Sequence, residues 1–348
     1  MNPLVTIITP SFNQAAYLPD AIRSVLSQDY SPIEYWVVDG ASTDGSVEII
    51  QNFSDRLTGW ISERDAGQSE AINKGLSKAQ GGIVAWLNSD DFYLPQAVSR
   101  AVEAFHSDRE LGMVFGDALA VDQRGWPLKW LGFGDWGLQE LVKFRIICQP
   151  AVFMRRSILE KAGFLDPSYN FMLDHHLWIR IAQLAPVLYA GGSEGENQAR
   201  SLPWAAARHH PGAKNVSQSP GFSNEIMRIL EWMHTVPDLE RIVQKDRRGV
   251  RAGAYRLSAR YLLDGGKYRE ALRSYLLATG SKPGYALKHW HRILYAVLSG
   301  IGLGFILDRL RAPYQLRRQQ QLAAELMSSS ESSGNLLDGW PGIHLAQK

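Results

Sequence analysis

The sequence predicts an α/β protein with a mostly parallel sheet flanked by helices, followed by a helical C-terminal extension. Short apolar runs of strand type alternate with amphipathic helical patterns from residue 4 to about residue 120. This alternation is the sequence signature of a parallel sheet with helices on both faces. Polar residues follow directly after several of the runs, at the strand ends where ligands of such sheets bind. Residues 221–290 carry helical patterns alone, which predicts the extension.

The first two repeats of this alternation cover residues 4–53. Residues 4–13 (LVTIITPSFN) are a β-branched apolar run that ends in a Pro-Ser step, and residues 15–28 carry apolar residues at helical spacing. Residues 33–46 (IEYWVVDGASTDGS) are a second apolar run that passes into a loop of small and acidic residues. Residues 47–53 begin the next helix. Each run is therefore expected to be a buried strand that ends in a polar loop.

The following repeats continue the pattern. Strand-type runs lie at residues 59–68, 82–91 and 111–122, and helical patterns lie at residues 69–79 and 94–108. Ser69 is the expected N-cap of the first of these helices, because a serine hydroxyl accepts a hydrogen bond from the free N–H groups of a first turn. The polar residues at the strand ends are Pro10 to Asn13, Asp39, and Asp90 with Asp91. One crevice at the carboxyl ends of the strands can gather them all.

The composition is ordinary for a globular protein, with 45% hydrophobic and 21% charged residues among 348. This length suffices for one large or two smaller domains. The net charge of +2 gives no reason to expect a nucleic-acid partner. Cys148 is the single cysteine, so no intrachain disulfide can form, and Met1 is not followed by the basic segment of a signal peptide. We therefore expect a cytoplasmic protein.

The pattern loosens between residues 125 and 215. Residues 125–147 are rich in aromatic residues and glycine, and we expect a loop there that can line a pocket. A strand is expected at Ala151–Met154 and a helix from about Leu173. Residues 256–278 resemble one helix pair of a tetratricopeptide repeat. A single pair cannot bury a solenoid core, so it is expected to pack on the predicted α/β domain.

The chain is expected to divide at about residue 215. Residues 1–215 form the predicted α/β domain, residues 216–315 a helical region, and residues 316–348 a polar tail that is expected to be flexible. The uncharged segment 293–307 (ILYAVLSGIGLGFIL) is shorter than the roughly 20 residues that span a bilayer. Three interpretations remain open for it. It is a packed C-terminal helix, an interfacial anchor at the inner face of the plasma membrane whose basic flanks meet anionic headgroups, or a short span.

Asp90 and Asp91 end the strand-type run Ile83–Leu87. Two adjacent carboxylates repel each other, and a hard divalent cation such as Mg²⁺ or Mn²⁺ relieves that repulsion while also binding phosphate oxygens. A nucleoside diphosphate supplies such oxygens, and the cation then stabilises the charge on a departing diphosphate. The alternative is a solvated turn in which Asp91 caps the following helix.

Six segments occur in an order and spacing typical of one family. They are TPSFNQAAYL (residues 9–18), VVDGASTDGS (37–46), DAGQSEAINKG (65–75), AWLNSDDFYLP (85–95), QPAVFMRR (149–156) and DHHLWIRIA (174–182). Over residues 4–215 the chain resembles the family-2 inverting glycosyltransferases of the GT-A fold. The resemblance implies transfer of a sugar from a nucleotide-diphosphate donor to a glycan or lipid-linked acceptor in cell-surface polysaccharide synthesis, with a divalent metal, Mn²⁺ or Mg²⁺.

The resemblance also implies roles for individual residues. Phe12 matches the aromatic residue that stacks on the base, and Asp39 matches the acid that accepts a hydrogen bond from a uracil N–H, so UDP is expected, with dTDP fitting the same contacts. Asp44, in the same loop, either contacts the donor or only shapes the turn. The residues implied to bind the donor are Pro10, Phe12, Asp39, Asp65, Gln68, Asp90 and Arg208, and those implied to bind the metal are Asp91 and His210.

Asp174 matches the catalytic base of the family. An inverting transfer needs one carboxylate to take the proton from the acceptor hydroxyl. In the family this base opens a helix that continues Leu-Trp-x-Arg, which here is Leu177–Arg180. Alternatively, Asp174 is only a helix N-terminal acid that the macrodipole favours, and the segment with Arg208 and His210 is an ordinary surface loop. Gln149 matches a polar position near the acceptor.

Two other classes of protein compete with the glycosyltransferase. One is a non-catalytic nucleotide-sugar-binding or scaffold protein of a polysaccharide assembly complex; the presence of Asp39, Asp91 and Asp174 together argues against it. The other is a nucleotidyltransferase, which shares a similar α/β core. That class needs a glycine-rich loop with a basic residue after the first strand, and the sequence TPSFNQ lacks both glycine and a basic residue.

Overall fold

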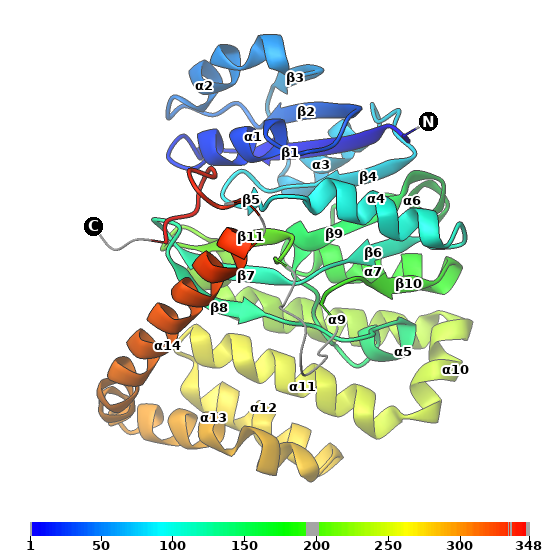
Figure 1. Ribbon diagram of the computed structural model, residues 1–348. Helices are drawn as coiled ribbons and strands as arrows, with labels where there is room; N and C mark the ends of the chain where they lie inside the picture. Colours follow the sequence, from blue (N-terminus) through cyan, green and yellow to red (C-terminus); the bar gives the residue numbers. More distant parts are fainter. Residues whose placement is uncertain (1, 193–201, 333, 335, 346–348) are drawn as a thin grey trace. The chain divides into compact units, whose positions relative to one another are not determined.

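The computed structural model describes residues 2–192, 202–332, 334 and 336–345 (Figure 1). It divides into two compact units. The first unit comprises Met1–Gly137, Ile147–His209 and Gln319–Lys348, and the second comprises Leu138–Ile146 and His210–Arg318. The strands belong to the first unit, and the described part of the second unit is helical.

A seven-stranded sheet forms the centre of the first unit. Its order is β10 (Val187–Tyr189), β6 (Met113–Phe115), β9 (Val152–Arg155), β4 (Ile83–Trp86), β1 (Val5–Ser11), β2 (Ile33–Asp39) and β3 (Gly59–Ser62). The pairs β1–β2, β1–β4, β2–β3 and β6–β10 are parallel, whereas β9 runs antiparallel to β4 and β6. The predicted fold class, α/β with a mostly parallel sheet flanked by helices, is confirmed.

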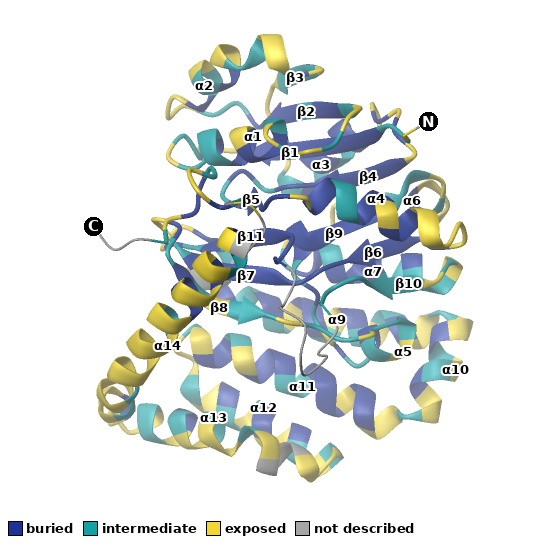
Figure 2. Ribbon diagram, in the orientation of Figure 1, coloured by how far each residue is buried: buried dark blue, intermediate teal, exposed yellow. Residues whose placement is uncertain are grey.

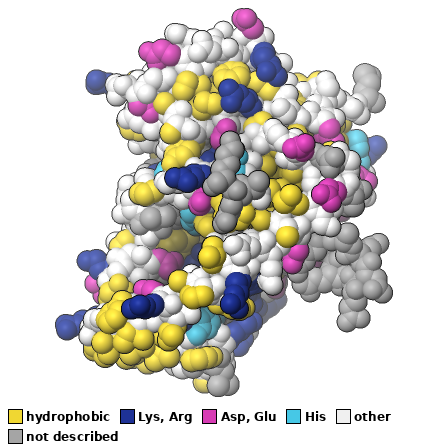
Figure 3. Space-filling view, turned by 60° about the vertical axis from the view of Figure 1, so that its left-hand side comes forward, with side chains coloured by type: hydrophobic (Ala, Val, Ile, Leu, Met, Phe, Trp, Pro, Cys, Tyr) yellow, Lys and Arg dark blue, Asp and Glu magenta, His cyan; other side chains and the backbone are white. Residues whose placement is uncertain are grey.

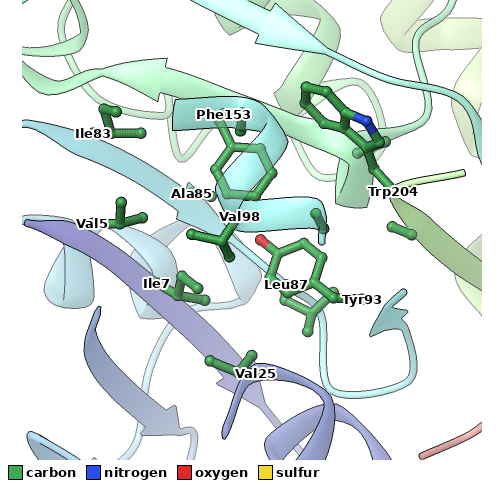
Figure 4. Packing of buried hydrophobic residues seen from close by; sticks show 14 of the residues in the cluster. Val5, Ile7, Val25, Ile83, Ala85, Leu87, Tyr93, Val98, Phe153 and Trp204 are labelled. Atoms are coloured by element: carbon green, nitrogen blue, oxygen red, sulfur yellow. The ribbon is translucent and has the colours of Figure 1, made fainter. Parts of the chain in front are cut away.

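Helices cover both faces of this sheet. They are α1 (Leu18–Leu26), α2 (Ser46–Asn52), α3 (Gln68–Leu76), α4 (Ala97–Ser107), α6 (Arg156–Ala162) and α7 (Leu173–Leu184), with 3₁₀ turns at Ser54–Arg56 and Gln149–Ala151. All residues of β1 are buried, as expected of a strand covered on both sides (Figure 2). On one face Ile7 packs in a core with Val98 and Phe153 (Figure 4). On the other, Gly75 approaches Ile8 so closely that an added Cβ would come within 2.5 Å of it, so α3 needs glycine there.

A second sheet of four strands lies in the same unit. Its order is β5 (Phe92–Tyr93), β11 (Ala205–His209), β7 (Ala118–Asp122) and β8 (Pro127–Leu131). The run predicted as one strand over residues 111–122 therefore divides between the two sheets. Gly116, at the division, lies against the indole of Trp204, where an added Cβ would come within 2.3 Å. Part of the loop expected at residues 125–147 is the strand β8, which pairs with β7.

The C-terminal segment differs from the flexible tail that we expected. Helix α14 (Gly304–Ser332) begins in the second unit and ends in the first, where the segment that follows it also belongs. Four of its buried residues, Leu322, Leu326, Leu337 and Ile343, pack with Phe92, Leu119 and Ala206 of the second sheet. Trp340 Nε1 donates to the carbonyl oxygen of Tyr93 at 2.8 Å. Although this segment is polar overall, its apolar residues thus complete the core at the second sheet. Residues 333, 335 and 346–348 of the expected tail lie outside the described residues.

The second unit contains seven further helices among its described residues. They are α5 (Leu138–Leu141), α8 (Lys214–Ser217), α9 (Ser219–Thr235), α10 (Pro237–Lys245), α11 (Arg247–Asp264), α12 (Tyr268–Ser281) and α13 (Gly284–Gly300). Asp246 caps α11 by accepting a hydrogen bond from the N–H of Gly249 at 3.0 Å. The helix pair predicted around residues 256–278 is present as α11 and α12, joined by a turn in which Gly266 has a φ of +74°.

The uncharged segment 293–307 is divided between α13 and α14 by a turn at residues 301–303. One side of α13 is packed: Ala296 is 2% exposed and lies with Ile293 in a cluster formed with α11 and α12. The opposite side is open, and Trp290 is 62% exposed. The segment is therefore a helical hairpin that is buried along one side only. In the part of the chain that the structure describes, no helix is both long and apolar enough to cross a membrane.

Candidate active site

The carboxyl ends of three neighbouring strands meet at one edge of the main sheet. Ser11 at the end of β1 lies opposite Asp39 at the end of β2, and Asp39 lies opposite Ser62 at the end of β3. The N–H of Gly40 continues this edge by donating to the carbonyl oxygen of Ser11 at 2.9 Å. These strand ends and the loops that leave them form the carboxyl edge at which the sequence predicts a crevice.

Asp39 is fully buried beneath this edge. Its carboxylate accepts hydrogen bonds from the N–H of Ser42 at 2.9 Å, the hydroxyl of Ser42 at 2.5 Å and the hydroxyl of Ser62 at 2.8 Å. A carboxylate has about four acceptor positions. Three of those of Asp39 are therefore occupied by hydrogen bonds that hold the loop in place. The structure thus gives Asp39 a framework role, and its contact with a nucleotide base stays a prediction.

Phe12 and Asp65 lie next to Gly40, the residue that follows Asp39. A Cβ atom added at Gly40 would lie 2.7 Å from Asp65 Oδ2 and 3.3 Å from Phe12 Cδ2, so both side chains converge on this glycine. The ring of Phe12 is 60% exposed, which is unusual for a phenylalanine and leaves a face open for stacking. Pro10 differs, because it lies within β1 and is buried, so it shapes the strand and presents no surface to a ligand.

Hydrogen bonds join the loop after β1 to the loop after β2. The N–H of Asn13 donates to the hydroxyl of Ser42 at 2.8 Å, and Asn13 Oδ1 accepts from the N–H of Thr43 at 2.9 Å. Asp44 accepts from the N–H of Ala15 at 2.9 Å. Burial acts to raise the pKa of Asp44, but hydrogen bonds from Ser46 and Ala15 outweigh it and hold the pKa below its usual range. Asp44 thus shapes the turn, the second of the two roles considered for it.

The loop after β3 brings Gln68 to the acid pair. Asp65 Oδ1 accepts from the N–H of Gly67 at 2.9 Å. Gly67, with a φ of +128°, occupies the N-cap position of α3 that was predicted for Ser69, and Ser69 instead donates to the carbonyl oxygen of Tyr169 at 3.1 Å. Gln68 Nε2 then donates to Asn88 Oδ1 at 2.7 Å.

Asp91 is held in the interior and not in a solvated turn, because it is 7% exposed. Its Oδ1 accepts from the N–H of Arg208 at 2.9 Å, and its Oδ2 accepts from Asn88 Nδ2 at 3.2 Å. Burial, together with the neighbouring charge of Asp90, raises the pKa of Asp91 well above its usual range. Asp91 does not cap α4 either, because the N-cap residue of that helix is Gln96.

Asn88 connects the site and was not singled out from the sequence. Its amide joins Gln68 and Asp91, and it also donates to Gln149 Oε1 at 3.1 Å. Gln149 in turn donates to the carbonyl oxygen of Trp86 at 2.7 Å. The only sequence signal for Asn88 is its place in the polar run that follows β4. Gln149, which was expected near the acceptor, therefore lies beside the acid pair.

Arg208 is buried among protein partners next to the acid pair. Its side chain is 2% exposed and forms an ion pair with Asp20, Nη2 to Oδ2, at 2.9 Å. Nε donates to the carbonyl oxygen of Asp90 at 3.0 Å and Nη1 to that of Gln123 at 2.9 Å. The guanidinium also lies 5.2 Å from the centre of the Phe92 ring. These buried contacts hold the backbone of the acid pair, and the binding of donor phosphates by Arg208 stays a prediction.

Asp174 lies in the first turn of α7, as predicted. The helix is attached to the end of β4, because Trp178 stacks on Trp86 with ring centres 5.2 Å apart. The segment before the helix is attached to the start of α3 through the hydrogen bond from Ser69 to Tyr169. Since α3 begins at the carboxyl edge of the sheet, these contacts bring the start of α7 toward that edge. The role of Asp174 as base stays a prediction.

The residues at the acid pair fit a divalent cation that is shared with a ligand. Asp91 is a buried carboxylate beside a second carboxylate, and each of its oxygens has an acceptor position left, which is the donor chemistry that Mg²⁺ and Mn²⁺ prefer. Nowhere among the described residues do three His, Cys, Asp or Glu side chains group to hold a metal by themselves. His210 belongs to the second unit, whereas Asp91 belongs to the first. The role of His210 at the metal therefore stays a prediction.

Comparison with known proteins assigns the chain to a family. The sequence profile of glycosyl transferase family 2 matches residues 6–163. A PGL/p-HBAD biosynthesis glycosyltransferase of Mycobacterium bovis BCG is 31% identical over 182 residues, which cover 51% of this chain and 69% of that protein. The chain belongs to glycosyltransferase family 2. The resemblance seen in the six sequence segments is thereby confirmed.

The chain is also similar to a second glycosyltransferase in sequence and to two solved structures in fold. The putative teichuronic acid biosynthesis glycosyltransferase TuaG of Bacillus subtilis is 36% identical over 129 residues, which cover 36% of this chain and 51% of that protein. The mannosyltransferase PcManGT of Pyrobaculum calidifontis, solved with GDP-Man and Mn²⁺, has a TM-score of 0.54 at 17% identity and covers 88% of each chain. Residues 1–349 of S. aureus TarS, solved with UDP-GlcNAc, have a TM-score of 0.50 at 14% identity, covering 84% of this chain and 90% of that one. The last two confirm the GT-A fold.

Proposed function

We propose that this family 2 protein is an inverting, metal-dependent glycosyltransferase. It transfers a sugar from a nucleotide-diphosphate donor to a hydroxyl of a glycan or lipid-linked acceptor. The proposed donor is a UDP-sugar. The observation that carries the proposal is the continuous set of polar contacts from Gln68 through Asn88 to Asp91, which joins the loops around Phe12 and Asp65 to the acid pair. A nucleotide lying along this edge has its base at Phe12 and its phosphates at the acid pair.

The base side of the site bears on which nucleotide is bound. The exposed ring of Phe12 offers a stacking face to any base, and the expected acceptor of a uracil N–H, Asp39, is buried. TarS, named with UDP-GlcNAc, and PcManGT, named with GDP-Man, show that this fold accepts different nucleotides. The proposal therefore places base selection on Phe12 and Asp65, which are the groups that reach the surface.

Asp90 and Asp91 would hold Mn²⁺ or Mg²⁺ together with the donor diphosphate. A cation bound there supplies electrostatic stabilisation to the leaving diphosphate oxygen. The protein holds the Asp91 carboxylate in place, because the N–H of Arg208 donates to Oδ1 and the amide of Asn88 donates to Oδ2. PcManGT, which is named as a Mn²⁺ complex, supports a divalent metal in this fold.

Asp174 would act as the general base. The acceptor hydroxyl oxygen attacks the anomeric carbon, the bond from that carbon to the diphosphate oxygen breaks, and the hydroxyl proton passes to the Asp174 carboxylate. One carboxylate suffices, because the configuration inverts in a single displacement. The names of TuaG, a putative teichuronic acid biosynthesis glycosyltransferase, and of the PGL/p-HBAD biosynthesis glycosyltransferase support an acceptor in polysaccharide synthesis. The cytoplasm is the location that belongs to this proposal.

Three carboxylate-to-amide variants test the proposal. Asp91→Asn keeps an acceptor for the N–H of Arg208 but loses the charge, so it should weaken Mn²⁺-dependent donor binding. Asp174→Asn should bind donor normally and lose about 10²- to 10⁴-fold in turnover, the usual contribution of a general base. Asp55→Asn, at an exposed 3₁₀ turn, is the matched control. The measurements are UDP-sugar hydrolysis with Mn²⁺ and donor affinity by calorimetry.

Equal activity of all three variants would refute the assigned roles. Wild-type protein that binds donor with Mn²⁺ but never turns it over, with any acceptor or with water, would instead support the non-catalytic binding protein.

A further inference from the structure

The hairpin formed by α13 and the first part of α14 exposes an apolar face. Trp290, Leu294, Val297 and Ile301 recur at positions i, i+4, i+7 and i+11, so they lie along one side of the helix. Trp290 and Ile301 are 62% and 66% exposed. Beyond the turn the face continues through Leu303, Phe305, Ile306, Leu310 and Tyr314, all of them exposed. Hydrophobic side chains gather in the lower part of Figure 3 with basic residues beside them, and contiguous patches of this kind are uncommon on soluble monomers.

The hairpin is fixed in shape. The hydroxyl of Tyr295 on α13 donates to Asp308 Oδ2 on α14 at 3.2 Å. The guanidinium of Arg311 lies 5.4 Å from the centre of the Tyr295 ring and donates to the carbonyl oxygen of His291 at 3.5 Å. On its other side α13 is anchored by Ala296 in the cluster with α11 and α12. The apolar face is therefore a stable surface of the folded second unit.

The charge of this segment is the reverse of that of the remaining chain. Residues 282–318 contain one acidic residue, Asp308, and seven Lys or Arg: Lys282, Lys288, Arg292, Arg309, Arg311, Arg317 and Arg318. The other residues of the chain contain 30 Lys and Arg against 34 Asp and Glu. The positive charge of the protein is thus concentrated in the segment that carries the exposed apolar face.

We propose that the α13–α14 hairpin docks this protein on an anionic lipid bilayer. The apolar face would enter the boundary between headgroups and acyl chains, and the basic residues would contact lipid phosphates. Trp290 and Tyr314 are of the residue types that favour this boundary. The hairpin would lie on the bilayer surface and would not span the bilayer, because the other side of α13 packs against α11 and α12.

A second copy of the chain is a poorer occupant of this face. Pairing two hairpins would bring two strongly basic segments together, and like charges across an interface oppose association. An anionic membrane satisfies both properties of the surface, the apolar area and its basic border, at once. The inference rests on the second unit alone and does not depend on the proposed transferase activity.

Vesicle co-sedimentation of the full-length protein tests the proposal. The vesicles are either phosphatidylcholine alone or phosphatidylcholine with phosphatidylglycerol, at low and at high salt. The wild-type protein should bind the anionic vesicles, bind the neutral ones far less, and lose binding as salt screens the charges. The double variant Arg309→Gln/Arg317→Gln should bind about 25-fold more weakly, at about fivefold for each basic residue. Ile301→Gln/Leu310→Gln should lose about tenfold or more through the lost apolar burial.

Matched variants at exposed positions of the first unit control for general effects. Arg109→Gln and Leu184→Gln change the same residue types outside the hairpin and should bind as the wild type does. Equal circular dichroism and melting temperatures show that the variants are folded. Binding that is absent, equal on neutral and anionic vesicles, or unchanged in the hairpin variants would overturn the proposal. So would a dimer of the wild type that Ile301→Gln/Leu310→Gln converts to a monomer without any vesicle binding.

Discussion

Replacing Arg208 distinguishes the structural role of this residue from the phosphate-binding role that the sequence suggested. The side chain is 2% exposed, and it donates to Asp20, to the carbonyl oxygen of Asp90 and to that of Gln123. Arg208→Met keeps much of the side-chain volume and removes all three contacts. Arg208→Lys keeps the charge but can replace only part of the fork of donors.

The magnitude follows from burial. Hydrogen bonds to charged groups contribute about 1.5–3 kcal/mol each, but returning the arginine to water offsets part of the sum. Breaking a buried ion pair by removing one partner typically costs about 3–5 kcal/mol. Asp20 is 30% exposed and can rehydrate, so the lower part of that range applies. For a unit of about 200 residues, 3 kcal/mol corresponds to a fall in melting temperature of about 6–12 °C.

The assay is differential scanning calorimetry, with donor affinity measured well below the melting temperature. We expect Arg208→Met to lower the melting temperature of the first unit by the amount above, and Arg208→Lys to lower it by less. The exposed Arg109→Met is the control. If Arg208→Met melted with the wild type while its affinity for the donor fell more than tenfold, the guanidinium would act on the phosphates and the structural argument would be wrong.

Three further changes follow from single observations. Gly40→Ala should weaken nucleotide binding in calorimetry without unfolding the protein, because the added Cβ comes within 2.7 Å of Asp65 Oδ2 and pushes it from the pocket surface. Leu326→Ala should lower the free energy of unfolding in urea by about 2–5 kcal/mol, because Leu326 is 1% exposed in the core of the second sheet, whereas a flexible tail would tolerate the change. The lowered pKa of Asp44 stabilises the fold above its usual value of 3.8, and this contribution disappears as the pH falls below that value. Acid titration of stability should therefore show a smaller loss in Asp44→Asn than in the wild type, and equal losses would contradict the assignment.

The strands and helices of the first unit could be predicted because their signals are local. The run Val5–Ser11 is apolar and β-branched, and the structure buries all of it in the parallel sheet. Phe12 was found because it directly follows the strand β1, so here too the neighbouring residues in the sequence carry the physical cause. Asp65 lies three residues after β3 and was found only through the family resemblance.

The partners of Arg208 could not be predicted in this way. Asp20 lies 188 residues away in the sequence, and nothing near either residue signals their contact.

The prediction of a flexible C-terminal tail was wrong for a related reason. Its few apolar residues, among them Leu337 and Trp340, are diluted by polar neighbours, so composition indicates disorder. Only the apolar surface of the second sheet, formed by residues much earlier in the chain, gives them a place to pack.

The position of Asp91 explains why a buried strand ends on two acids. Strand β5 begins at Phe92, and its pairing with β11 stops at Ala206. The N–H of Arg208, two residues further along β11, therefore has no backbone acceptor on that side, and a buried N–H without a partner is costly. The carboxylate of Asp91 takes the place of the missing strand by accepting that N–H at 2.9 Å. The same carboxylate thus completes the edge of a sheet and, in the proposed function, is a ligand of the cation, and an asparagine could replace it only in the first of these tasks.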